Sequence, residues 1–259
     1  MSKVILIGEL PLNILIRSNG SVALEPCDRI GRTAAALARS GIRAEMVGEA
    51  AADPVGSSVV DFLTAAGVDV RSVDRFTEGA GCQHDRFEQP DGSWLTVGYD
   101  SRLSEEFDCI WPRIDEGDVV VFGSWFALSE RVRPRLNDLL SHARARKATI
   151  VYLPYFEDFQ VSRVTRVMPS ILDNMEMADV IIATTGDLQR LFGSGDAEKA
   201  YRDHLEFYTP RVYVIDPAAA TIAKYPGPEI AGTGAGVCYA DTTVAALTQI
   251  LRNLNRTDI

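Results

Sequence analysis

The 259-residue sequence is poor in the side chains that build metal and disulfide frameworks. It has three histidines and four cysteines, and no two of the cysteines (Cys27, Cys82, Cys109 and Cys238) form a C-x-x-C pair. Structural zinc sites and disulfide-rich folds generally rely on such pairs. We therefore expect no metal site, and reduced thiols of the kind that cytoplasmic proteins contain.

Long apolar runs and an excess of positive charge are also absent. No run approaches the 18 residues of a membrane span, and the apolar part of the opening segment is too short for a signal peptide. Acidic residues outnumber basic ones by 36 to 26, which gives a net charge of −10. A net-acidic chain is not attracted to nucleic acids or anionic membranes. We expect a cytoplasmic protein without partners of either kind.

Three glycine motifs of common α/β enzymes are missing as well. The sequence has only four lysines, and none of them completes a G-x-x-x-x-G-K-[ST] phosphate-binding loop. It contains no G-x-S-x-G element, and no G-x-G-x-x-G element surrounds Gly8. These absences argue against a P-loop enzyme, an α/β-hydrolase and a dinucleotide-binding domain.

Short β-branched runs alternate along the chain with amphipathic stretches of helical length. The predicted strands are Val4–Ile7, Ala44–Val47, Asp118–Phe122, Thr149–Leu153, Val180–Ala183 and Arg211–Ile215. The predicted helices are Arg32–Ser40, Val55–Ala66, Ser129–Arg146, Met168–Met177, Ala197–Phe207 and Val237–Asn253. Near-continuous apolar strands are typical of sheets covered on both faces. The alternation predicts an α/β fold with a doubly wound, mostly parallel sheet flanked by helices.

Two segments interrupt this alternation and predict a small β flap. Asn19-Gly20 divides the apolar segment 12–24, and Pro90-Asp91-Gly92 divides the strand-like segment 83–97. Asn-Gly between apolar runs is a strong hairpin signal. We expect one domain over residues 1–259, with a flap formed by about residues 12–24 and 83–97.

The first of these segments also predicts an interaction surface. Apolar side chains alternate with polar ones at Leu12, Ile14, Ile16, Val22 and Leu24. A small flap cannot bury such a face alone. We therefore expect a homodimer through the flap.

One glycine cluster, Gly232-Thr233-Gly234-Ala235-Gly236, precedes the last predicted helix. Backbone N–H groups at a helix N-terminus can bind an anion, and the helix dipole favours negative charge there. We interpret Gly234, Ala235 and Gly236 as a candidate anion hole, with a simple flexible turn as the alternative.

The order of these features resembles the ribokinase/phosphofructokinase-B (PfkB) family of carbohydrate kinases. The matching elements are Gly8-Glu9, the helix end 34–41, Gly48, the turn Asp53–Gly56, Gly67–Asp69 and Gly234–Gly236, which matches the start of the family's G-A-G-D signature. The resemblance implies a ribokinase-like fold with a β lid, a sugar beneath the lid, and ATP along the carboxyl ends of the strands.

The sequence departs from that family at the positions of phosphoryl transfer. Val237 stands where the family has its general base, and a valine cannot accept a proton. Thr185-Gly186-Asp187-Leu188 stands where the family has N-x-x-E, which helps to hold magnesium. Pro217 and Ala220 stand where a nucleotide loop has glycines.

The sugar-binding positions of the family differ too. Its early Asp is Asn13 here, its Gly-Gly pair is Cys27-Asp28, and its following Asn is Arg32. A D-x-N-x-R pattern corresponds to segment 153–157. Asn13, Asp28 and Arg32 are the candidate substrate-binding residues, and they could either form a new pocket or fill the old one.

Two functions follow from these comparisons. The first is a catalytically degenerate kinase homologue that binds a sugar or nucleotide and acts as a binding or regulatory module, with no catalytic residue and no metal. The alternative is an active ATP- and Mg²⁺-dependent sugar or nucleoside kinase with relocated groups. In that case Asp241 or Asp216 would replace the base.

The degenerate hypothesis predicts that Val237→Asp does not restore a kinase. Loss of a general base alone costs about 10²–10⁴-fold in rate. Because the metal and nucleotide positions are altered as well, we expect no appreciable sugar phosphorylation by the wild type and far less than that gain in the variant. Coupled assays of both proteins over a panel of sugars test this, and robust turnover by the wild type refutes it.

Overall fold

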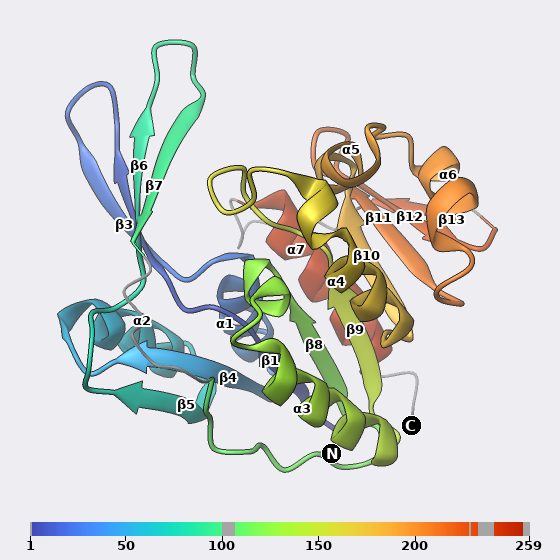
Figure 1. The fold of residues 1–259 in the computed structure, drawn as a ribbon, viewed down its shortest axis with the longest axis horizontal. Helices are drawn as coiled ribbons and strands as arrows, with labels where there is room; N and C mark the ends of the chain where they lie inside the picture. The colour runs from blue at the N-terminus through green and yellow to red at the C-terminus, as the bar shows by residue number, and fades with distance from the viewer. Residues whose placement is uncertain (1, 100–106, 228, 233–240, 256–259) are drawn as a thin grey trace.

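The chain is built around a nine-stranded sheet (Figure 1), seen in a computed structural model that describes residues 2–99, 107–227, 229–232 and 241–255. Its strands are β1 (Val4–Ile7), β4 (Ala44–Ala51), β5 (Asp69–Phe76), β8 (Val119–Gly123), β9 (Thr149–Leu153), β10 (Val180–Thr184), β11 (Val212–Asp216), β12 (Thr221–Tyr225) and β13 (Glu229–Gly232). They lie in the order β13-β12-β11-β10-β9-β8-β1-β4-β5. All neighbours are parallel except at one edge, where β12 is antiparallel to β11 and to β13.

Helices cover both faces of this sheet, as the apolar strands predict. They are α1 (Arg29–Arg39), α2 (Pro54–Ala65), α3 (Arg133–Ala145), α4 (Val164–Glu176), α5 (Thr185–Phe192), α6 (Ala197–Ala200) and α7 (Thr242–Leu254), with a 3₁₀ turn at Trp125–Leu128 and a π turn at Tyr201–Leu205. Val4 and Leu6 pack in one buried cluster with α1, α2 and α7. Ile5 and Ile7 pack in the other with α3, α4 and α5. The expectation of a doubly wound, mostly parallel sheet flanked by helices is confirmed.

A second, four-stranded sheet projects from the first (Figure 1). It contains β2 (Leu12–Ile16), β3 (Val22–Pro26), β6 (Gln83–Glu88) and β7 (Trp94–Tyr99), in the order β3-β2-β6-β7. Two antiparallel hairpins, β2–β3 and β6–β7, join through the parallel pair β2–β6. Gly20 turns the first hairpin with a φ of 80°, which a glycine adopts without strain. We refer to this unit as the second sheet.

Two helices begin at residues other than those predicted from the sequence. The last helix begins at Thr242 rather than Val237, because the side chain of Asp241 accepts hydrogen bonds from the N–H groups of Thr243 and Val244 and caps it. In the same way, the Asp28 cap starts α1 three residues before the predicted Arg32.

Within the described residues, no helix is both long and apolar enough to cross a membrane.

Candidate functional site

A cavity of about 720 Å³ lies between the second sheet and the carboxyl ends of the central strands. Glu9 follows β1, Ser124 follows β8 and Tyr155 follows β9, while the second sheet supplies the facing wall. We call this cavity the cleft. Its lining is strongly polar and includes Glu9, Asn13, Glu25, Asp28, Arg29, Arg32, His84, Arg86, Trp94, Thr96, Tyr155, Glu157, Asp158, Phe159, Arg190 and Asp241.

The start of α1 forms the floor of the cleft. Asp28 caps this helix by accepting from the N–H groups of Ile30 and Gly31, and it also accepts a hydrogen bond from the Tyr155 hydroxyl. Burial raises the pKa of the Asp28 carboxyl above its ordinary value. Burial likewise raises the pKa of the Tyr155 hydroxyl, so Tyr155 serves as a hydrogen-bond donor and not as a base.

Arg29 links this floor to the far side of the sheet. Its guanidinium lies 4.2 Å from the centre of the Tyr155 ring and donates to the Asp187 carboxylate at 2.7 Å. Asp187 is 3% exposed and belongs to a capping box with Thr184 at the start of α5. The Oδ2 atom of the Asp187 carboxylate, which accepts from Arg29, also accepts from the Thr184 N–H at 2.9 Å.

Cys27 occupies a backbone conformation that favours glycine. Its φ is 67°, and the residue is completely buried. A Cβ atom built at Gly31 would lie 2.5 Å from the Cys27 Cβ and 2.7 Å from its Sγ. The Cys27 side chain therefore fits only because Gly31, one turn along α1, has none.

Arg32 and Asp241 meet at the mouth of the cleft. The Arg32 guanidinium lies 3.2 Å from the Asp241 carboxylate and 3.8 Å from that of Glu25. Asp241 caps α7. Its carboxylate is about one-third exposed and lines the cleft.

Every arginine that lines the cleft has a carboxylate partner. Besides the pairs of Arg29 and Arg32, Arg86 lies 3.5 Å from Glu157 and Arg190 lies 2.8 Å from Asp158. The cleft is thus rich in hydrogen-bonding groups, yet its positive charges are compensated internally. Such a lining favours a neutral polar ligand over a polyanion.

In the turn between β11 and β12, a side-chain carboxylate accepts hydrogen bonds from backbone N–H groups. Asp216 accepts hydrogen bonds from the N–H groups of Ala218 and Ala219 at 3.0 and 3.1 Å. Ala220 has a φ of 53°, so this turn keeps a left-handed residue without a glycine. The N–H groups of Ala218 and Ala219 are therefore satisfied by a side chain that is itself negative.

The candidate substrate residues come together, although in structural roles. Asn13, Asp28 and Arg32 all line the cleft. The Asn13 amide donates to the carbonyls of Glu25 and Cys27 and so braces β3 against the start of α1. The candidate anion hole Gly234, Ala235 and Gly236, together with Val237, lies outside the described residues.

Sequence reasoning missed most of the cleft lining. Arg29, Tyr155 and Arg190 reach it from three separate elements, and no local motif marks them. Tyr155 lies in segment 153–157, which we singled out from the sequence only because it departs from the D-x-N-x-R pattern of the family. Position after a parallel strand is the signal that could have identified it, since ligands bind at the carboxyl ends of such strands.

Comparisons with known proteins agree with this architecture. Residues 33–224 match the model of the pfkB family carbohydrate kinases. A fructokinase from Vibrio cholerae O395 superposes with a TM-score of 0.81 at 18% identity, covering 100% of this chain and 90% of that one. A fructokinase from Halothermothrix orenii gives 0.72 at 15% identity, covering 95% and 96%. An uncharacterized sugar kinase from Pyrococcus horikoshii in complex with ATP gives 0.72 at 14%, covering 88% and 76%. A search of curated proteins finds no match.

The raised pKa of Asp28 predicts a pH-dependent effect of Asp28→Asn. In the wild type the folded state holds this proton more tightly than the unfolded state, so the contribution of Asp28 to stability falls as pH rises from its ordinary pKa of 3.8 through the raised value. Asparagine also caps helices but does not titrate in this range. We expect the variant to gain stability relative to the wild type as pH rises, measured by urea unfolding between pH 4 and 7. A difference that is constant with pH contradicts this account.

Proposed function

Because the chain belongs to the pfkB carbohydrate kinase family, we propose that it binds a neutral, sugar-like ligand in the cleft and has lost phosphoryl transfer. The observation that carries this proposal is the pairing of all four cleft arginines with carboxylates. A sugar offers hydroxyl groups that both donate and accept hydrogen bonds. It can bind such a lining without separating any of the ion pairs.

The described residues at the positions where the family resemblance places ATP and Mg²⁺ do not fit these ligands. Asp187, the carboxylate of the α5 capping box, already accepts from Arg29 and from the Thr184 N–H. Asp216 accepts hydrogen bonds from two N–H groups of the turn that precedes β12. Its negative charge would repel a phosphate. Phosphoryl transfer depends mainly on positioning and on electrostatic stabilisation of phosphate charge. These contacts therefore support a binding protein over a kinase.

The wall formed by the second sheet supports sugar binding. Arg86 and Thr96 are paired across β6 and β7 and both line the cleft. Among the described residues, the Arg86 Nε has no hydrogen-bond partner although it is buried, so it is a donor suited to a ligand hydroxyl. Trp94 and Phe159 add aromatic surface at the same wall. Apolar surface with a few directed polar groups is typical of small-molecule sites.

One observation favours the active-kinase alternative. Asp241 lies at the N-terminus of a helix, lines the cleft and is partly exposed, as a general base must be. Its carboxylate, however, already pairs with the Arg32 guanidinium at 3.2 Å. If the alternative holds, the wild type phosphorylates a sugar and Asp241→Asn abolishes that turnover.

The proposal predicts that a sugar, and not ATP with Mg²⁺, stabilises the protein. A ligand present at 100 times its Kd stabilises the folded state by about 2.7 kcal/mol. For a chain of this length, this is a Tm increase of roughly 5–10 °C. We expect that increase with at least one member of a sugar panel in a thermal-shift assay, and no increase with ATP and Mg²⁺.

Two glutamates provide a matched pair of variants for that assay. Glu157 pairs with Arg86 inside the cleft, whereas Glu116 pairs with Lys147 away from it at 3.3 Å. A hydrogen bond to a charged group contributes about 1.5–3 kcal/mol. We expect Glu157→Gln to weaken sugar binding by about 10-fold or more and Glu116→Gln to leave it unchanged. Equal effects of the two variants, or stabilisation by ATP alone, would contradict the proposal.

We also infer that two copies of the chain associate through the second sheet. Strand register places one row of four apolar residues across the sheet: Val22, Ile16, Phe87 and Leu95. The next row is Leu24, Ile14, Asp85 and Val97, so it is apolar except at Asp85. Val22, Leu24 and Leu95 are each more than half exposed. Leu12, which the sequence analysis included in this face, is buried in the interior cluster instead. A group of exposed apolar side chains on one face of a sheet is typical of protein interfaces.

This inference predicts that Leu24→Asp produces a monomer. A charge in the middle of an apolar interface must be desolvated without a partner, which strongly opposes association. Ile110→Asp is the matched control, because Ile110 is 64% exposed but lies outside the second sheet. We expect light scattering to give twice the chain mass for the wild type and the control, and the single-chain mass for Leu24→Asp. A monomeric wild type at micromolar concentration overturns the inference.

A further inference from the structure

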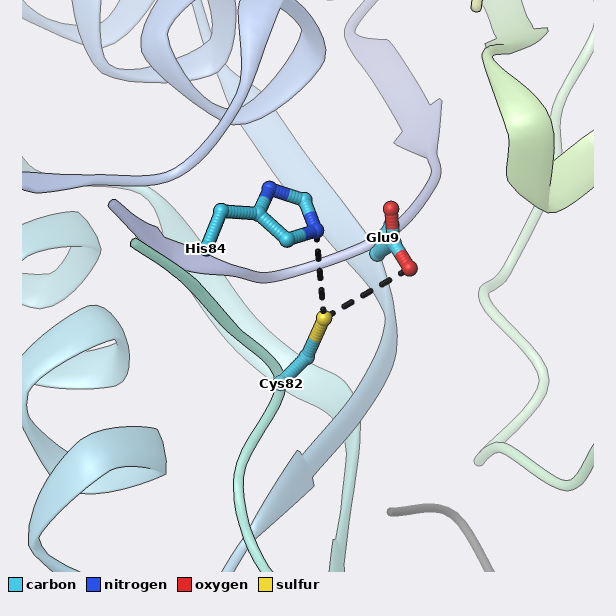
Figure 2. A group of neighbouring side chains, drawn as sticks. All are labelled: Glu9, Cys82 and His84. Carbon is cyan, nitrogen blue, oxygen red and sulfur yellow. Dashed lines mark hydrogen bonds between the residues drawn. The ribbon is translucent and has the colours of Figure 1, made fainter. Parts of the chain in front are cut away.

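Three side chains with different donor atoms converge beneath the second sheet: Glu9, Cys82 and His84 (Figure 2). Glu9 follows β1, Cys82 immediately precedes β6, and His84 is the second residue of β6. Residues two apart on an extended chain point to the same side, which directs Cys82 and His84 toward Glu9. Their carboxylate oxygen, thiol sulfur and imidazole nitrogen all lie within 4.8 Å of one another.

We propose that Glu9, Cys82 and His84 form a binding site for one Zn²⁺ ion. The Cys82 Sγ lies 3.8 Å from the His84 Nε2 and 3.6 Å from the Glu9 Oε1. Tetrahedral Zn²⁺ with ordinary bond lengths holds its sulfur about 3.6 Å from its nitrogen and oxygen ligands. The two separations that involve the sulfur therefore match those of a tetrahedral ion, and the nitrogen and oxygen lie within 4.8 Å of each other.

The donor set selects the class of metal. A thiolate, an imidazole and a carboxylate together suit zinc and related transition metals, whereas Mg²⁺ and Ca²⁺ prefer oxygen ligands alone. In the part of the chain that the structure describes, no other group of three such side chains converges in this way. This site is accordingly separate from any magnesium ion that would accompany a nucleotide.

Neighbouring groups hold two of the three side chains in place. Gln160 donates to the Glu9 Oε2 at 3.5 Å, which leaves Oε1 as the atom that faces Cys82. The Phe159 ring packs edge-on against the His84 ring with centroids 5.1 Å apart. Glu9 and His84 are only 5% and 6% exposed. Support of this kind orients metal ligands and raises affinity.

The fourth coordination position opens toward the cleft. Glu9 and His84 both line that cavity, and Glu9 and Cys82 line a separate small pocket. Sites with three protein ligands and an open position bind water or a ligand oxygen at the fourth. A hydroxyl group of a molecule in the cleft can therefore coordinate the ion directly. The site itself does not depend on the proposed sugar binding, because its protein ligands are complete without it.

Zinc binding is tested with the full chain by equilibrium dialysis and elemental analysis. We expect one Zn²⁺ per chain, and a loss of affinity of more than about 100-fold in Cys82→Ser and in His84→Gln, since loss of even a supporting residue costs about 10–100-fold. Cys109→Ser and His142→Gln are matched controls that remove a thiol and an imidazole elsewhere. Unchanged binding in the two site variants, or equal loss in the controls, overturns the proposal.

Two measurements on the wild type avoid the risk that a variant misfolds. Cobalt in place of zinc is expected to give strong visible bands of a tetrahedral ion together with a thiolate-to-cobalt charge-transfer band. Zinc is also expected to slow alkylation of Cys82, as measured by mass spectrometry of the peptide that contains it. A weak octahedral cobalt spectrum, or alkylation of Cys82 at the same rate with and without zinc, would show that these residues are only hydrogen-bonded neighbours. The sugar thermal-shift assay in the absence of zinc reports separately on the proposed function.

Discussion

The ion pair between Arg29 and Asp187 holds together the two halves of the cleft floor. It joins the first turn of α1 to the first turn of α5, which lie on opposite faces of the central sheet. Asp187 is almost completely buried, so removing its partner would leave an uncompensated charge at a cost of about 3–5 kcal/mol. Tyr155 packs on the same guanidinium and hydrogen-bonds to Asp28. The carboxyl ends of the strands are thereby closed by a network of one guanidinium, two carboxyl groups and one tyrosine hydroxyl.

Strands and hairpins could be predicted from the sequence because their signals are local. The six predicted strands coincide with β1, β4, β8, β9, β10 and β11 to within a few residues, since each is an apolar run covered on both faces. The edge strands β5 and β13, the neighbouring β12 and the eight-residue α5 were missed. Edge strands need no apolar run, and α5 is too short to show a helical period. Apolar periodicity misplaced the starts of α1 and α7, because the capping residues Asp28 and Asp241 determine where these helices begin.

Residues of the cleft could be predicted from the sequence only at positions that correspond to a motif of the family. Asn13, Asp28 and Arg32 were identified in this way, and all three line the cleft. Their roles could not be predicted, because each role depends on a partner far along the chain: Asp28 on Tyr155, and Arg32 on Asp241. Glu9 and His84 are separated by 75 residues and become neighbours only when β6 pairs with β2 beside the end of β1. Tertiary pairing of this kind leaves no trace in local spacing.

The contact between Cys27 and Gly31 limits the order in which these two positions can evolve. Any side chain at position 31 would meet the Cys27 side chain at 2.5 Å, far inside van der Waals distance. Replacement of Gly31 is therefore barred for as long as Cys27 keeps its side chain, whereas Cys27 can become glycine first and in doing so relieves its left-handed backbone. A cysteine can therefore replace a glycine at position 27 only where position 31 is already glycine.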